Sequence, residues 1–169
     1  NCYPVLIGPV SFLMLAKKAE DFDDCRCTLV PGLVAVYIEI CQKLLAQGIN
    51  WIQLDEPCLA LDLEERYKGA FQTAYKMIKA AVPEMNIFVP TYFDGLRDNL
   101  DLAFSLPVQA IGVDLVRAPN QLDAVIAKAK ETGIFPIFGI VDGRNVWRND
   151  LSASLAQLEK AKATLGVEF

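Results

Sequence analysis

The stretch of sequence that decides the fold is WIQLDEP, residues 51–57. Four residues suited to a buried strand run directly into the adjacent carboxylates of Asp55 and Glu56, and Pro57 follows them. A strand that is apolar throughout, rather than at alternate positions, is typical of a parallel sheet. In parallel α/β folds, functional side chains gather where the strands end. The two acids therefore either act on a ligand or satisfy the polar end of a buried strand.

Four further segments share this continuously apolar pattern, at residues 4–8, 87–92, 110–116 and 135–141. Between the five segments, apolar residues recur at i, i+3 and i+4, which predicts helices over residues 33–45, 67–78, 96–104, 122–129 and 152–165. Gly48, Gly133 and Gly166 are expected to end three of them. Helices of this length supply the crossovers that parallel strands need. We therefore expect an α/β fold whose strands are covered on both faces.

Five (β/α) units of about 30 residues make roughly five-eighths of a TIM-type (β/α)8 barrel. We interpret residues 1–169 as this partial barrel domain, a piece of a longer protein. A doubly wound open sheet is the alternative, but no G-x-G-x-x-G motif follows any strand. Pro4, Gly8 and Pro9 are expected to break any helix in the first residues, which argues against a signal peptide.

Composition excludes several classes of protein. Hydrophobic residues make up 53% of the chain, but no uninterrupted apolar run reaches the roughly 20 residues of a membrane span. A net charge of −5 without a basic run argues against nucleic acid as a partner. Five cysteines, an odd number, indicate reduced thiols and a cytoplasmic location. The chain has no histidine, so His-dependent catalysis and His-ligated metal are excluded within it.

Charged side chains follow four of the five predicted strands, and in a closed barrel they would converge on one rim. They are Asp55 and Glu56 after the second strand, Asp94 (with Tyr92) after the third, Asp114 and Arg117 after the fourth, and Asp142 and Arg144 (with Asn145) after the fifth. One interpretation is a substrate-binding rim. The other is a network that seals the barrel mouth, in which Asp55 or Asp114 pairs with Arg117 or Arg144. No residue is assigned as catalytic or as a metal ligand.

The segments WIQLDEP, VDLVRAP and GIVDGRNVWRNDL, in this order, resemble the amino-terminal barrel of the cobalamin-independent methionine synthase family. PVLIGPVSFLMLAK is similar to the fourth-strand segment of that barrel, and TYFD to its sixth. The resemblance runs from Pro4 to about Leu165 and makes the chain strands four to eight. One departure is Gly112, where the family often has a histidine two residues before the Asp of DLVR. This departure argues against a ligand at Gly112.

The resemblance implies a methyltransferase that moves a methyl group from 5-methyltetrahydrofolate polyglutamate to the thiol of homocysteine, giving methionine. It implies two face-to-face barrels and a zinc ion that lowers the pKa of the thiol. The zinc ligands and the homocysteine pocket would belong to the carboxy-terminal barrel. The main amino-terminal folate contacts would belong to the first units of the present barrel. The chain would then support barrel packing and folate binding, bind no zinc and be inactive alone.

Two other functions remain open at this stage. Carboxylates at several strand ends would suit a self-contained, magnesium-dependent lyase or hydrolase, because Mg²⁺ prefers oxygen ligands. A non-enzymatic assembly module is the other, because the two edges of an incomplete sheet carry unpaired backbone groups that favour self-association.

Overall fold

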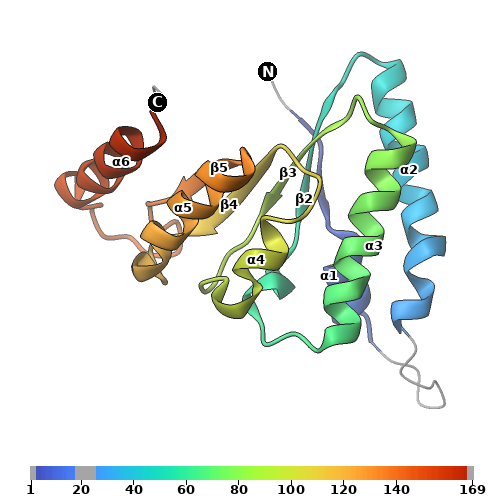
Figure 1. The fold of residues 1–169 in the computed structure, drawn as a ribbon, viewed down its shortest axis with the longest axis horizontal. Coiled ribbons are helices and arrows are strands. Elements are labelled where there is room, and N and C mark those ends of the chain that lie inside the picture. The colour runs from blue at the N-terminus through green and yellow to red at the C-terminus, as the bar shows by residue number, and fades with distance from the viewer. Residues whose placement is uncertain (1–2, 18–25, 167–169) are drawn as a thin grey trace.

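The chain folds around one parallel sheet of five strands, with helices between them (Figure 1). The computed structural model describes residues 3–17 and 26–166. The strands are β1 (Val5–Ile7), β2 (Trp51–Asp55), β3 (Asn86–Pro90), β4 (Ala110–Asp114) and β5 (Phe135–Gly139). The helices are α1 (Pro9–Leu15), α2 (Val30–Ala46), α3 (Glu65–Ala81), α4 (Leu100–Ala103), α5 (Leu122–Thr132) and α6 (Leu151–Leu165). All five predicted strands are confirmed.

The strands pair in chain order, β1-β2-β3-β4-β5, and every pair is parallel. A doubly wound sheet reverses its strand order at a switch point, and no reversal occurs here. The order is that of consecutive (β/α) units, as in part of a barrel. The sheet is not closed, because β1 and β5 lie at its two edges.

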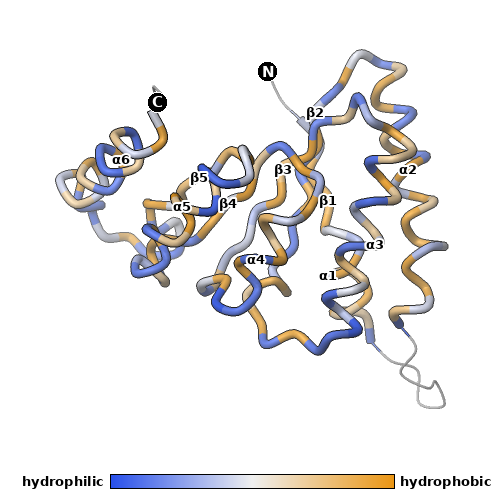
Figure 2. Tube along the Cα trace, viewed as in Figure 1, coloured by the Kyte–Doolittle hydropathy of each residue, from blue (hydrophilic) through white to orange (hydrophobic). Residues whose placement is uncertain are grey.

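Only one face of the sheet is fully covered. The side chains of Ile52, Ile87 and Ile111 are 0% exposed and join helix residues in one hydrophobic cluster. On the opposite face, Trp51 is 41% exposed and Ile137 is 40% exposed. Figure 2 shows hydrophobic residues along the strands as well as on the helices. The expectation that both faces are covered is therefore wrong for this face, because successive side chains alternate and the helices pack on one side.

The predicted apolar stripes form the helical side of the core. The stripe of α3 (Tyr67, Phe71, Ala74, Tyr75 and Ile78) is buried throughout, and so is that of α5 (Leu122, Val125, Ile126 and Ala129). α2 and α3 pack against each other and against α1. The third predicted helix, over residues 96–104, is shorter than expected and consists of a 3-10 turn, Arg97–Asn99, followed by α4.

The first helix was not expected. α1 begins at Pro9, directly after β1. Proline is favoured in the first turn of a helix, where its missing N–H would have no partner, so it starts α1 rather than preventing it. Val10 and Leu13 on this helix are buried in the hydrophobic cluster.

The helical segment Arg26–Ala46, which contains α2, is long and apolar enough to cross a membrane by length and composition, with a mean hydropathy of 1.6. The sequence pattern does not reveal this length, because Pro31 and Gly32 interrupt the apolar run, yet the helix continues through both. Such a segment is weak evidence for a membrane span, since core helices of soluble proteins pass the same test. Val34, Tyr37 and Cys41 on α2 are buried within the fold.

Candidate ligand-binding rim

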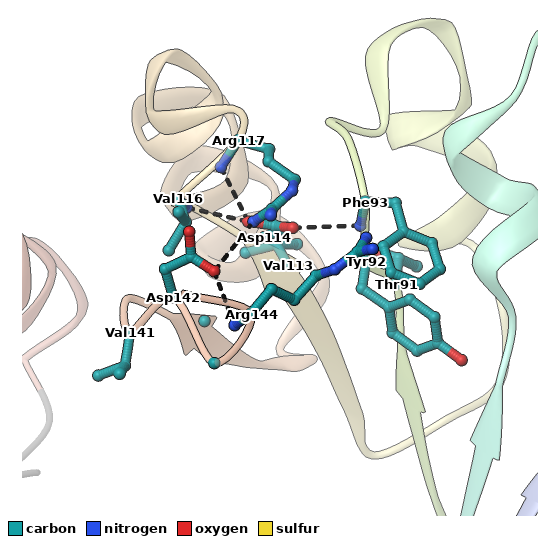
Figure 3. A pocket seen from close by; sticks show the side chains of 12 residues that line it. Thr91, Tyr92, Phe93, Val113, Asp114, Val116, Arg117, Val141, Asp142 and Arg144 are labelled. Atoms are coloured by element: carbon teal, nitrogen blue, oxygen red, sulfur yellow. Dashed lines mark hydrogen bonds and ion pairs between the residues drawn. The ribbon is translucent and has the colours of Figure 1, made fainter. Parts of the chain in front are cut away.

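The carboxyl ends of β3, β4 and β5 surround a hollow of about 220 Å³, which we call the rim hollow (Figure 3). Its lining includes four of the predicted side chains, Asp114, Arg117, Asp142 and Arg144. They meet there because parallel strands end at the same edge of the sheet. Asn145 lies on the same loop as Asp142, just outside the hollow.

Asp114, at the end of β4, is held by backbone N–H groups. Its Oδ1 accepts from the N–H of Val116 at 3.0 Å and from that of Arg117 at 2.9 Å. Its Oδ2 accepts from the N–H of Phe93, in the loop after β3, at 3.1 Å. Asp114 therefore ties the loop after β3 to the end of β4, and its partners are not the arginine side chains considered in the sequence analysis.

Asp142, in the loop after β5, organises that loop. Its Oδ1 accepts from the backbone N–H of Arg144 at 3.0 Å, and its Oδ2 accepts from Nδ2 of Asn145 at 2.7 Å. The Oδ1 atom also lies 3.6 Å from Nη1 of Arg117. The N–H of Arg144 and then the charge of Arg117 lower the pKa of this carboxyl. An Asp/Arg pair thus lines the mouth, formed by Asp142 and Arg117.

The side chain of Arg144 reaches across the rim hollow towards the loop after β3 (Figure 3). Its guanidinium carbon lies 5.4 Å from the centre of the Phe93 ring, in a cation–π contact. Phe93 in turn packs edge-on against Tyr92, with ring centres 4.6 Å apart. The backbone of Phe93 has a φ of 80°, a conformation that is uncommon for a bulky residue, and the ring is 56% exposed.

Asp55 ends β2 and forms a separate hydrogen-bonded group. Its Oδ1 accepts from Nε2 of Gln53 at 2.7 Å, and its Oδ2 accepts from the hydroxyl of Tyr92 at 3.2 Å. Burial and then the nearby Asp55 charge raise the pKa of Tyr92 to about 12. Among the described residues Asp55 has no arginine partner, so the predicted sealing pair does not form there.

Glu56 lies in the core, away from the rim hollow, and is 0% exposed. Its carboxylate accepts from the N–H groups of Val10 at 3.3 Å and Ser11 at 2.8 Å, and from the hydroxyl of Tyr75 at 3.0 Å. Burial raises its pKa to about 7 from an ordinary value of 4.5. A Cβ atom on Gly8 would lie 2.1 Å from its Cδ. Glu56 therefore joins the end of β2 to the start of α1.

Comparison with known proteins identifies the chain. The family described as "Cobalamin-independent synthase, N-terminal domain" matches residues 1–166. The chain belongs to this family. The resemblance noted in the sequence is thereby confirmed over nearly the whole chain.

Curated relatives of the chain carry the name 5-methyltetrahydropteroyltriglutamate–homocysteine methyltransferase. The relative from Rhodopseudomonas palustris is 48% identical over 165 residues, that from Nitrobacter winogradskyi 44% over 165 residues, and that from Vibrio parahaemolyticus 47% over 163 residues. The matches cover 96–98% of this chain but 21% of each relative. The cobalamin-independent synthase N-terminal domain described here therefore spans about one-fifth of the length of these relatives.

The described side chains of this N-terminal domain do not form a zinc site. Within the described ranges, no group of three or more His, Cys, Asp or Glu could hold a metal ion. The same observation applies to magnesium, because the carboxylates of Asp55, Asp114 and Asp142 do not come together as one ligand set. Cys41 and Cys58 are buried free thiols, and Cys2 and Cys25 lie outside the described residues.

Two residues with clear roles were missed as candidates in the sequence. Phe93 stands within the quoted TYFD segment, but its stacking with Arg144 depends on a positive φ that the sequence does not reveal. Tyr75 was assigned to the apolar stripe of α3, and its hydroxyl is also a partner of Glu56. A buried tyrosine usually needs a hydrogen-bond partner, and that was the available signal.

Proposed function

We propose that this chain is the amino-terminal barrel region of a cobalamin-independent methionine synthase. The parent enzyme would transfer the methyl group of 5-methyltetrahydropteroyltriglutamate to homocysteine and release methionine. The observation that carries the proposal is the 44–48% identity, over 96–98% of the chain, to enzymes that bear the name of this reaction. The catalytic carboxy-terminal barrel would lie outside these 169 residues.

In this proposal the chain supports barrel packing and folate binding and does not catalyse the reaction alone. Zinc and the homocysteine pocket would belong to the carboxy-terminal barrel, its partner within the parent protein. The lack of histidine in the chain and of a metal-ligating group in its described part supports this division of roles. Zinc, when bound there, would supply the Lewis acidity that lowers the pKa of the homocysteine thiol.

We also propose a cytoplasmic location for the parent enzyme. Cys41 and Cys58 are free thiols, and both are buried within the fold. Reduced cysteines are typical of the cytoplasm. Fractionation of cells expressing the tagged parent protein tests this assignment, and recovery from a secreted or membrane fraction would contradict it.

An exchange of segments tests the proposed function. The chain replaces the matching segment of the Rhodopseudomonas palustris relative, and the chimera is expressed in a methionine auxotroph that lacks this enzyme. We expect growth without methionine, and we expect no methionine from the chain alone with folate donor, homocysteine and zinc. A soluble, folded chimera without activity would contradict the role assigned to the chain. Turnover by the isolated chain would contradict the division between the two barrels.

A further inference from the structure

Among the described residues, the guanidinium of Arg144 in the rim hollow has no ionic partner, whereas Arg117 is paired with Asp142. We propose that Arg144 and Phe93 form a carboxylate-binding subsite, and that it takes one carboxylate of a γ-linked glutamyl chain. This inference rests on the proposed function, because that reaction supplies a substrate with a triglutamate tail. It goes further by assigning a place for part of that tail.

The rim hollow has unused hydrogen-bond donors, whereas its carboxylate acceptors are already engaged. Both oxygens of Asp114 accept hydrogen bonds from backbone N–H groups, and both oxygens of Asp142 are engaged by donors of their own loop. Arg117 is paired with Asp142. Among the described residues, the Arg144 guanidinium has the Phe93 ring as its partner and no hydrogen-bond acceptor. The unused capacity is therefore donor capacity, which suits an anionic acceptor.

The geometry leaves the guanidinium ready for a carboxylate. A cation–π contact occupies one flat face of the group and leaves its N–H edge free, and that edge can bind a carboxylate through two parallel hydrogen bonds. Asp114 fixes the backbone of Phe93, and Phe93 supports Arg144. We therefore assign Asp114 as a positioning residue and Arg144 as the group that contacts the ligand.

The remaining walls select the shape of the ligand. Val113, Val116 and Val141 add apolar surface to the lining of the rim hollow. A volume of about 220 Å³ lies below the range of about 300–1,000 Å³ that is typical of sites for drug-sized ligands. A glutamyl side chain, with two methylenes and a carboxylate, combines the required apolar and anionic parts. A whole folate would not fit within it.

Titration of the 169-residue chain with γ-linked triglutamate, followed by NMR or calorimetry, tests the subsite. We expect Arg144→Gln to weaken binding by tenfold or more, since a charge-assisted hydrogen bond is lost. Arg148→Gln, which removes the same charge from an exposed position outside the rim hollow, should change the affinity less than twofold. Equal losses in the two variants would overturn the proposal.

Further probes separate the sources of binding. A γ-linked triglutamine of the same length should bind at least tenfold more weakly than triglutamate, and equal binding would overturn a carboxylate site. Acetate that competes as well as triglutamate would overturn the glutamyl assignment. Triglutamate should also protect Arg144, but not Arg148, from modification by phenylglyoxal, read by mass spectrometry. These binding tests do not require turnover. An inactive chimera would therefore contradict the proposed function, whereas a failed binding test would contradict only the subsite.

Discussion

At the scale of single residues, Glu56 is the group whose protonation matters most for stability. It is fully buried, and burial raises the pKa of its carboxyl to about 7 from 4.5, against the opposing effect of its hydrogen bonds. Between pH 4.5 and about 7, the unfolded chain loses this proton and the folded chain keeps it. The folded state then binds more protons, so stability falls as pH rises through this window and levels off above it.

The free energy of unfolding should fall by roughly 2 kcal/mol from this one group between pH 5 and 7.5, because each pKa unit corresponds to about 1.4 kcal/mol and part of the titration lies outside this range. Glu56→Gln keeps the size of the side chain and removes the titration, so the fall should disappear whatever the absolute stability of the variant. Urea unfolding at several pH values measures it. Glu84→Gln, at an exposed acid, serves as the control and should keep the wild-type slope. If the free energy of unfolding of Glu56→Gln still falls with pH as in the wild type, another group is responsible for the fall.

Gly8 and Glu56 form a second prediction at this scale. A Cβ on Gly8 would lie 2.1 Å from Cδ and 2.2 Å from Oε1 of Glu56, so the buried carboxylate would have to move. We expect Gly8→Ala to destabilise the fold by about 1–3 kcal/mol, measured by urea unfolding. Gly69→Ala in α3 adds the same methyl group where no atom lies within 4 Å, and it should stabilise the fold by up to about 1 kcal/mol. If both variants change the free energy of unfolding by the same amount, steric contact with Glu56 does not explain the effect of Gly8→Ala.

The acids of WIQLDEP show why sequence placed some rim residues correctly and others not. Adjacent strand residues point to opposite faces, so Asp55 and Glu56 cannot share one site. Asp55 bonds to Tyr92 on the open side, and Glu56 enters the core. Asp114 and Asp142 both line the rim hollow because each follows a strand end, and the topology of the sheet places those ends side by side. The donors that each acid meets depend on loop conformation, which the sequence pattern does not specify.

At the scale of elements, the loop between β5 and α6 is fixed at both ends by aspartates. Asp142 organises its start, and Asp150 caps α6 by accepting from the N–H of Ala153 at 3.0 Å. We expect Asp150→Ala to destabilise α6 by about 1 kcal/mol. Amide exchange in α6 should then be faster than in the wild type, while exchange in α3 should not change. Asp150→Ser keeps a capping oxygen, so the stability of α6 should stay within a few tenths of a kcal/mol of the wild-type value. Equal exchange in all three proteins would show that packing alone holds α6.

Element boundaries were predictable where one residue type has one effect. Gly133 and Gly166 end α5 and α6 with positive φ, as expected. Pro9 has two possible effects, since proline breaks a helix interior but starts a helix well, and the sequence pattern did not decide between them. The burial of Val10 and Leu13 favours the helix, and that packing becomes visible only in the fold.

At the scale of the whole molecule, the uncovered face of the sheet and its two open edges dominate the expected behaviour of the isolated chain. Val5, Trp51, Phe135 and Ile137 expose 40–53% of their surface there, beside the unpaired edges of β1 and β5. In a closed barrel this face would be the filled interior. An apolar face next to open strand edges favours pairing with a second copy of the chain.

We therefore expect the isolated chain to self-associate, and we expect Ile137→Lys to shift sedimentation velocity profiles towards monomer. Lysine on this face adds charge to the apolar surface and leaves the backbone pairing of β5 unchanged. Val36→Lys is the matched control, because Val36 is 51% exposed on the outer side of α2, away from the sheet. The control should associate as the wild type does. A wild-type chain that stays monomeric at high concentration would contradict the prediction that this face drives self-association. If both lysine variants dissociate equally, general charge repulsion rather than the sheet would be responsible.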